Sequence, residues 1–213
     1  SSMIFVYPNA ERTILSYKGE GQHLDVNKIP SDKLKTNWFY IDSLGGHYDL
    51  FEALVNHAVK NKIKIACNPG GKEIERGLEK LKPLLSQIDI FVINKEEAKN
   101  LLGEESTQSS EWILNILQKA VKGIVVLTDG HNGVRVRTGD REFSAGVPDS
   151  PMVERTGAGD AFGSGFVSEY MRSSDIVKAI QFATANASSV VAKFGAKAGI
   201  LYKGDFGPWP LVN

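Results

Sequence analysis

Cysteine is nearly absent from this chain of 213 residues, which has Cys67 alone. One thiol excludes a disulfide within the chain and is typical of a reducing compartment. We expect Cys67 to be a buried strand residue and not a nucleophile. The four histidines show no metal-ligand spacing, so nothing in the sequence indicates a histidine-based metal site.

Net charge is also absent, because 25 basic residues balance 25 acidic ones. The sequence therefore lacks the basic surface that nucleic acid requires and the polybasic patch that an anionic membrane attracts. No apolar run has the length of a membrane span, and the first residues lack the pattern of a signal peptide. We expect a cytoplasmic protein with no nucleic-acid or membrane partner.

What the chain does have is a regular alternation of apolar strands and amphipathic helices. Its strands are expected at residues 37–42, 62–68, 88–93 and 123–128, and its longer helices at 47–61, 95–102, 110–121, 158–171 and 175–194. The segment 72–87 is expected to be helical with a break at Pro83. This order predicts an α/β fold, with a mostly parallel sheet and helices on both faces.

Two hairpins are expected in addition. Residues 133–137 and 141–145 read as one, and residues 3–7 and 12–17 read as the other, with a turn at 8–11. The N-terminal hairpin lies outside the strand–helix rhythm, so we expect it to project as a flap and to offer a surface for pairing with a second copy of the chain.

The most informative stretch runs from Glu154 to Phe166 and contains Gly157-Ala158-Gly159-Asp160 before a helix of small residues. Small residues let backbone N–H groups approach a ligand, and a helix start adds its positive dipole end. These amides suit a transferred phosphoryl group, and Asp160 suits a general base on a hydroxyl. The alternative for Asp160 is a plain role in the first turn of a helix.

Asn94 and Glu97 lie where a buried strand gives way to a helix, three residues apart. One amide and one carboxylate suit a hydrated Mg²⁺, which takes few protein ligands. The alternative is a helix cap with an acidic first turn.

Two further segments carry weaker patterns. Thr128-Asp129-Gly130 follows a buried strand, and its glycine allows a nucleotide to approach, although an ordinary strand-end turn explains it equally well. Asn186 lies in a helix of small residues, which indicates either a closely packed ligand or close packing against another element.

In this order, these residues resemble the ribokinase-like (PfkB) family of carbohydrate kinases. The resemblance covers nearly the whole chain and is most specific at Glu154–Phe166. It implies a three-layer α/β/α fold, with residues 1–22 as the remnant of a β lid and residues 23–213 as the nucleotide-binding and catalytic domain.

The resemblance also implies roles for individual residues. Asp160 would be the catalytic base and Gly157, Ala158 and Gly159 the anion hole. Asn94 and Glu97 would organise Mg²⁺ and the phosphates of ATP, Thr128 and Gly130 would line the nucleotide site, and Asn186 would lie near the adenine. Glu154 and Thr156, together with Gly195, would be candidates for a monovalent cation site such as one for K⁺.

Two features depart from the family pattern. Glu154-Arg155 stands where the family has Asp-Thr, and we expect the longer side chain of Glu154 to disturb the cation site. The family's opening strand, with its sugar-binding aspartate and Gly-Gly motif, has no counterpart here, since Gly45-Gly46 lies on a later loop. We therefore expect unpaired edges inside the sheet, where that strand would lie.

Two functions remain open at this point. One is an ATP-dependent kinase that phosphorylates a hydroxyl of a sugar or a related small molecule. The other is a truncated, catalytically weak nucleotide-binding module or regulatory fragment of such a kinase. A dinucleotide-binding site is disfavoured, because no glycine stands three residues after Gly159.

Overall fold

The computed structural model describes residues 2–7, 12–16, 25–26, 29–103 and 109–209. The chain forms two compact units, which are described in turn. The larger comprises Gly21–Gly130 and Arg135–Phe143, and the other comprises Ser1–Glu20, His131–Val134 and Ser144–Asn213. The expected boundary at residue 22 lies outside the described residues and stays a prediction.

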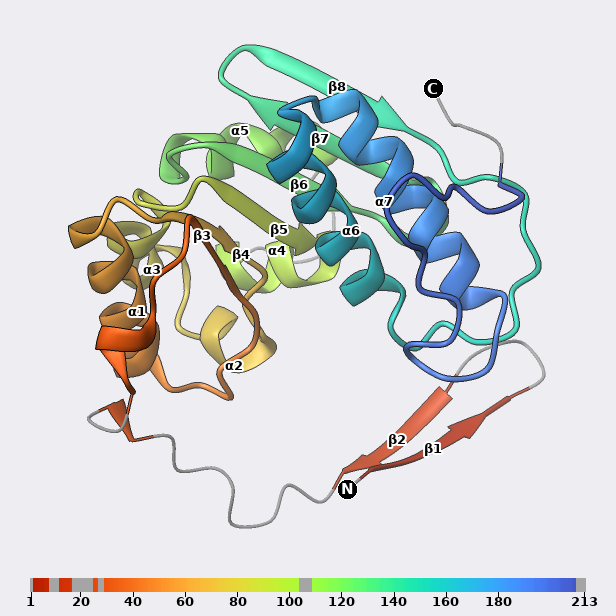
Figure 1. Cartoon of the computed structure of the whole chain (residues 1–213), viewed down its shortest axis with the longest axis horizontal. Helices are drawn as coiled ribbons and strands as arrows, with labels where there is room; N and C mark the ends of the chain where they lie inside the picture. The colour runs from red at the N-terminus through yellow and green to blue at the C-terminus, as the bar shows by residue number, and fades with distance from the viewer. Residues whose placement is uncertain (1, 8–11, 17–24, 27–28, 104–108, 210–213) are drawn as a thin grey trace. The chain divides into compact units, whose positions relative to one another are not determined.

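A six-stranded sheet, nearly all of it in the larger unit, has its strands in the order in which they occur along the chain (Figure 1). Its strands are β3 (Trp38–Ile41), β4 (Lys64–Cys67), β5 (Ile90–Asn94), β6 (Ile124–Thr128), β7 (Val134–Thr138) and β8 (Arg141–Ala145). Strands β3 to β6 pair in parallel, as the alternation with helices predicts. Two residues join β7 to its neighbour β8, which forms the expected hairpin.

The gap expected inside the sheet is not found among the described strands, and that expectation was wrong. Strand β3 hydrogen-bonds to β4, and each later strand to the next, so the order is continuous from β3 to β8. Among the described strands, β3 is instead the edge strand at one end of this sheet, because each crossover places the following strand directly beside the previous one.

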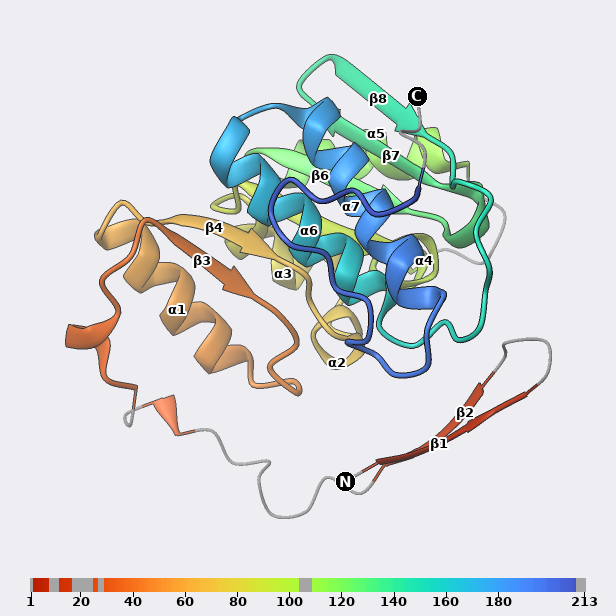
Figure 2. The same cartoon turned by 45° about the vertical axis from the view of Figure 1, so that its right-hand side comes forward.

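Five helices of the larger unit supply its core together with one face of the sheet. They are α1 (Tyr48–Lys60), α2 (Gly71–Ile74), α3 (Leu78–Leu85), α4 (Lys95–Leu102) and α5 (Ser110–Ala120). Alternate strand residues pack against them, including Ile65, Phe91 and Val125. Figure 2 shows α1 running along β3 and β4. Each fully buried side chain of this size contributes roughly 1.5–3 kcal/mol.

The intervening strand residues are buried as well, among them Ala66, Val92 and Val126. The continuous apolar runs of β4, β5 and β6 follow from this burial on both faces, since a strand with one solvated face would alternate apolar and polar residues.

The segment 72–87 forms two helices as expected, but the break is at Gly77 and not at Pro83. Gly77 has a φ of +79°, which ends α2 and starts α3. Pro83 lies within α3, where its ring removes one backbone hydrogen bond. A positive φ interrupts a helix completely, whereas one missing donor in a packed helix does not.

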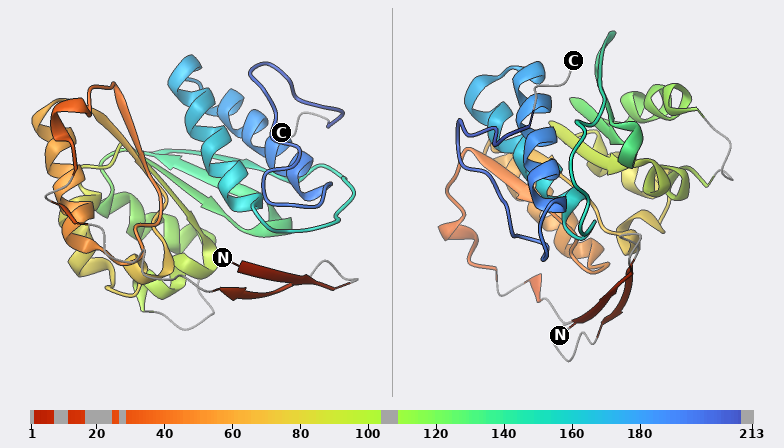
Figure 3. Two further views of the ribbon diagram at one scale, coloured as in Figure 1. Left: turned by 60° about the horizontal axis from the view of Figure 1, so that its bottom comes forward. Right: turned by 90° about the vertical axis from the view of Figure 1, so that its right-hand side faces the viewer.

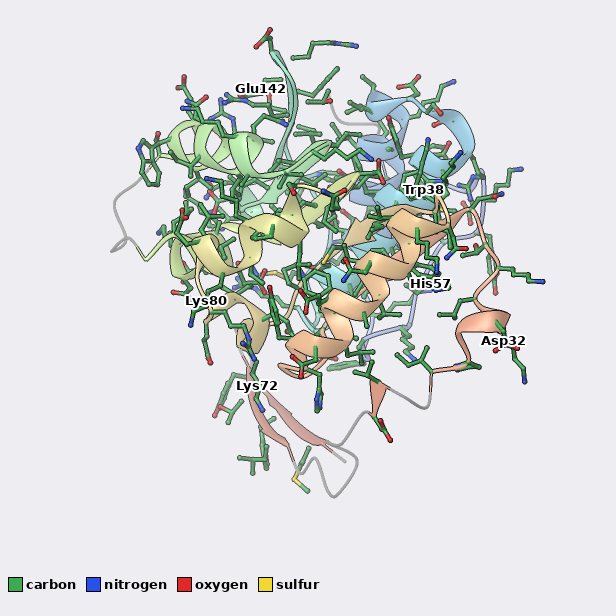
Figure 4. The ribbon with its side chains drawn as sticks, turned by 90° about the vertical axis from the view of Figure 1, so that its left-hand side faces the viewer. Asp32, Trp38, His57, Lys72, Lys80 and Glu142 are labelled. Carbon is green, nitrogen blue, oxygen red and sulfur yellow. The ribbon has the colours of Figure 1, made fainter. Side chains whose placement is uncertain are left out.

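A buried carboxylate ties α2 to the loop between β3 and α1. Glu73 is 2% exposed, and its Oε1 accepts hydrogen bonds from the backbone N–H groups of Leu44 at 3.2 Å and Gly46 at 2.5 Å. Gly70 is required beside it, because a Cβ there would lie 2.1 Å from Ser43 Oγ and 2.9 Å from Glu73 Oε2. Lys72 and Lys80, labelled in Figure 4, are exposed on α2 and α3.

The other unit contains the N-terminal hairpin and two long helices. Strands β1 (Ser2–Val6) and β2 (Arg12–Ser16) pair antiparallel, with Met3 opposite Leu15, as expected. Met3, Phe5, Tyr7 and Leu15 are exposed. The turn expected at 8–11 lies outside the described residues, and the homodimer expected through this hairpin stays a prediction.

Helices α6 (Ala158–Ser173) and α7 (Ile176–Val191) lie side by side (Figures 1 and 3). Small residues allow this close approach, since a Cβ on Gly165 would lie 3.2 Å from Ala183 Cα. Phe162, Phe166 and Tyr170 stack in sequence along α6.

The contacts of Glu73 generate a testable prediction. Glu73→Ala leaves the N–H groups of Leu44 and Gly46 without their acceptor, so we expect the free energy of unfolding to fall by about 2–4 kcal/mol. Urea denaturation followed by circular dichroism measures this change. Glu75→Ala, at an exposed position at the end of the same helix, is the control and should stay within about 0.5 kcal/mol of the parent. Equal effects of the two substitutions would contradict the assigned role of Glu73.

Candidate functional site

The parallel strands of the larger unit bring three predicted site residues to one edge of the sheet. Asn94 ends β5 and Thr128 ends β6, and the two are direct partners in the ladder. Gly130 follows two residues later, with a φ of +53° that suits glycine. Carboxyl ends of parallel strands are where ligands bind in open α/β sheets.

Asn94 and Glu97 form a capping box at the start of α4. Asn94 Oδ1 accepts from the Glu97 N–H at 2.9 Å, and Glu97 Oε2 accepts from the Asn94 N–H at 3.1 Å. The helix-cap interpretation is therefore confirmed. The magnesium role stays a prediction, and the two roles are compatible because a hydrated Mg²⁺ takes few protein ligands.

The described residues contain no group of three or more His, Cys, Asp or Glu side chains that could hold a metal ion. A site with one carboxylate and one amide fits Mg²⁺ that arrives with the phosphates of a nucleotide, and does not fit an all-protein metal cage.

An ion pair beside the capping box was missed by the sequence reasoning. Lys95 Nζ lies 2.7 Å from Asp129 Oδ2, and the two side chains are 26% and 27% exposed. Lys95 is the first residue of α4, and Asp129 follows Thr128. A signal was present in the sequence, because a cation at a helix N-terminus opposes the helix dipole and calls for a compensating anion.

In the other unit, Gly157 is the N-cap residue of α6 and has a φ of +83°. A Cβ at this position would lie 2.3 Å from the carbonyl oxygen of Ala196, so only glycine fits without displacing backbone. As a glycine, Gly157 has no side chain with which to cap the helix, whereas the N-cap residues Asn94, Ser109 and Asp175 accept a backbone N–H through their side chains.

The first turn of α6 is open to a ligand. Gly159 and Asp160 are exposed, and a Cβ on Gly159 would meet no heavy atom within 4 Å. The Ala158 N–H donates to the Arg155 carbonyl at 3.3 Å, but the first amides of a helix have no partners within the helix itself, so this turn presents N–H donors at the positive end of the dipole. An exposed carboxylate beside such donors can bind a proton while the amides bind an anion.

Two of the predicted cation residues, Glu154 and Gly195, meet through a buried carboxylate. Glu154 is 5% exposed, and its Oε2 accepts the Gly195 N–H at 2.8 Å. Thr156 Oγ1 is buried and has no hydrogen-bond partner among the described residues. A buried, unpartnered hydroxyl oxygen fits a cation ligand, so the donor set present here is compatible with the monovalent cation that the resemblance implies.

Asn186 is buried and uses both ends of its amide within its own unit. Its Nδ2 donates to the Ala161 carbonyl at 2.8 Å, and its Oδ1 accepts the Leu201 N–H at 2.8 Å. These bonds join α7 to α6 and to the segment after α7, which is the packing role that the sequence left open. The adenine contact stays a prediction.

Cys67 is buried at the end of β4, as expected, and lines a small pocket with Asp42 and Glu73. Burial raises the pKa of its thiol well above the usual value, and the nearby carboxylates of Asp42 and Glu73 add to the effect. A protonated thiol is a poor nucleophile, which agrees with the structural role assigned from the sequence.

The predicted residues thus fall into two local groups, one in each compact unit. The larger unit holds Asn94, Glu97, Thr128 and Gly130, and the other holds the α6 N-terminus, Glu154, Thr156 and Asn186.

No described helix is both long and apolar enough to cross a membrane. The cytoplasmic location remains a prediction.

Several proteins with related sequences are described as kinases. An uncharacterized sugar kinase of Archaeoglobus fulgidus is 26% identical over 214 residues, which cover 94% of this chain and 79% of that protein. A cytidine kinase of Thermococcus kodakarensis is 30% identical over 182 residues, which cover 83% of this chain and 63% of that protein. The chain therefore spans less than two thirds of the length of the cytidine kinase.

Solved structures show the same fold at lower identity. An E. coli protein assigned as a ribokinase II, solved with ATP and Mg²⁺, superposes with a TM-score of 0.78 at 20% identity, covering 94% of this chain and 67% of that one. The nucleoside kinase of Methanocaldococcus jannaschii gives a TM-score of 0.74 at 22% identity, covering 93% and 63%. The fold is therefore the ribokinase-like α/β fold that the sequence predicts.

A family model for pfkB family carbohydrate kinases matches residues 1–201. That range includes both local groups of candidate site residues. The chain belongs to the pfkB family of carbohydrate kinases.

Proposed function

We propose that this chain carries the nucleotide-binding and catalytic part of an ATP-dependent kinase for a hydroxyl group of a sugar or sugar-like molecule. The observation that carries the proposal is the start of α6. There, a helix that begins at a glycine, a close backbone contact that leaves no room for a Cβ on that glycine and an exposed Asp160 occur within four residues. A phosphoryl acceptor site needs donors for the migrating charge and a base for the acceptor proton.

In this mechanism the Asp160 carboxylate takes the proton of the acceptor hydroxyl as its oxygen bonds to the γ-phosphorus of ATP, while the bond from that phosphorus to the bridging β,γ oxygen breaks and ADP leaves. A positioned base of this kind contributes roughly 10² to 10⁴ in rate. The amides of Gly157, Ala158 and Gly159 hold the charge that spreads over the phosphoryl oxygens. Loss of one such oriented donor costs on the order of 3 kcal/mol in the barrier.

The larger unit supplies the nucleotide side of the reaction. Asn94 and Glu97 would hold a hydrated Mg²⁺, and Thr128 and Gly130 would line the nucleotide. When bound, Mg²⁺ neutralises phosphate charge. The capping box supports this assignment, because it holds the Asn94 amide and the Glu97 carboxylate in one orientation at the strand edge.

Glu154 and Thr156 are proposed as ligands of a monovalent cation such as K⁺. The buried hydroxyl oxygen of Thr156 and the buried carboxylate of Glu154 support this choice. Such a cation would lie near the segment that leads into α6 and would stabilise the conformation of that segment.

A nucleotide-binding module with weak or no kinase activity is the second candidate. Titration with ATP, combined with an ADP-release screen over sugars, sugar phosphates and nucleosides, distinguishes the two. ATP binding without acceptor-dependent ADP release would favour the module.

Substitution of the proposed base gives the most direct test. Asp160→Asn removes the proton acceptor but keeps the shape of the side chain, so kcat should fall by about 10²-fold or more while the Kd for ATP changes by only a few-fold. Asp140→Asn, at an exposed turn between β7 and β8, is the control and should change neither value. If Asp160→Asn weakens ATP binding as much as turnover, Asp160 has a structural role.

Substitutions at two glycines at the start of α6 distinguish an effect on stability from an effect on activity. Gly157→Ala forces a Cβ into the Ala196 carbonyl at a positive φ, so the free energy of unfolding should fall by more than about 2 kcal/mol. Gly159→Ala has room for its methyl group and should fold as stably as the parent, yet lower kcat at least about tenfold by crowding the phosphoryl group. Urea denaturation and steady-state kinetics measure the pair. Full activity in Gly159→Ala would count against the anion hole.

Glu97→Gln separates the helix cap from the metal site. A glutamine oxygen can still accept the Asn94 N–H, so the stability of the chain should be retained. The carboxylate charge is lost, so the Mg²⁺ concentration for half-maximal activity should rise several-fold. Asn94→Ala, in contrast, removes both the amide near the metal and the helix cap, so it should lower the free energy of unfolding by about 1 kcal/mol. If Glu97→Gln needs no more Mg²⁺ than the parent, Glu97 has a role in the helix cap and none in metal binding.

A further inference from the structure

The ion pair between Lys95 and Asp129 joins the two strand ends of the proposed nucleotide site. Lys95 comes directly after Asn94, and Asp129 directly after Thr128, while Asn94 and Thr128 are partners in the sheet. The Lys95 ammonium, 2.7 Å from Asp129 Oδ2, therefore lies at the point where the ends of β5 and β6 meet.

The fold gains little from a cation at this position. Lys95 occupies the first turn of α4, where a positive charge opposes the helix dipole and so has a small unfavourable effect. An ion pair whose side chains are about a quarter exposed returns little more than that cost, because solvent screens it. A residue that breaks a local preference without a clear gain in stability points to a role in function.

The chemistry of the pair fits a polyanionic ligand. A lysine ammonium binds phosphate as a compact point charge with three donors, and it reorients easily on its flexible stem. Asp129 offers one negative charge, whereas the phosphates of a nucleoside triphosphate offer several, so exchange of one partner for the other is favourable. With Lys95 and Asp129 both partly exposed, solvent and ligand can reach the ammonium without unfolding of the helix.

We propose that Lys95 contacts the phosphates of the bound nucleotide, and that Asp129 is a positioning residue that holds its ammonium at the strand edge until the nucleotide arrives. Binding then exchanges the Asp129 carboxylate for a phosphate oxygen at Lys95 Nζ. This inference rests on the proposed function, since it assigns a residue within the same nucleotide site.

The test measures the Kd for Mg²⁺–ATP and for adenosine by calorimetry, in the full chain and its variants. Lys95→Met keeps the apolar stem and removes the charge, and should raise the Kd for ATP about tenfold while leaving the Kd for adenosine unchanged. Asp129→Asn removes the competitor of the phosphate and should lower the Kd for ATP about two- to fivefold. Lys95→Arg should restore most of the affinity lost in Lys95→Met.

Lys99→Met, one turn further along α4, is the matched control and should bind ATP as the parent does. Lys95→Gln serves as a second neutral variant if Lys95→Met does not fold. The loss in Lys95→Met should shrink as salt is raised, because salt screens the attraction between the ammonium and the phosphates.

A purely structural ion pair gives the opposite pattern. Both single substitutions would then weaken ATP binding alike, and the exchanged pair Lys95→Asp with Asp129→Lys would restore it, which would overturn the inference. An unchanged Kd for ATP in Lys95→Met, with normal binding by the parent, would overturn the inference alone. Absence of ATP binding by the parent would instead overturn the proposed function, and this inference with it.

Discussion

The parallel hydrogen bonding between β5 and β6 is the constraint on which the nucleotide side of the molecule depends. It places Asn94 opposite Thr128 and so brings two loops that are more than thirty residues apart in sequence to one edge of the sheet. The Lys95–Asp129 ion pair follows from that register, and the capping box of Asn94 and Glu97 lies beside it. A shift of one residue in either strand would turn these side chains to the opposite face and separate them.

The start of α6 depends on backbone geometry instead. Gly157 adopts a positive φ against the carbonyl of Ala196, and this close contact fixes how the chain enters the helix. Glu154 accepts the N–H of Gly195, which joins the same two segments a few residues away. The segment before α6 and the segment after α7 therefore support each other, and they hold the exposed turn of Gly159 and Asp160 in place.

Several residues near the candidate site make structural hydrogen bonds and are also proposed to contact a ligand. Glu97 both closes a capping box and presents a carboxylate at the strand edge. Asn186 joins α7 to α6 through its amide, in a position where the family resemblance implies adenine. This double role favours ligand binding, because a side chain whose rotamer is already fixed by a structural hydrogen bond loses little conformational entropy when a ligand binds it.

The sequence by itself determined the fold class, the order of the elements and the small-residue stretch before α6, because burial on both faces and the dihedral needs of glycine leave direct marks on residue type. It also placed Asn94 and Thr128 at strand ends, although it could not show that they are partners. Only the tertiary structure decided the partner of Lys95, the continuity of β3 to β8 and the buried contacts of Glu73, Glu154 and Asn186. Each of these depends on which segments meet in space, and residues far apart in the chain carry no local pattern that specifies their contacts.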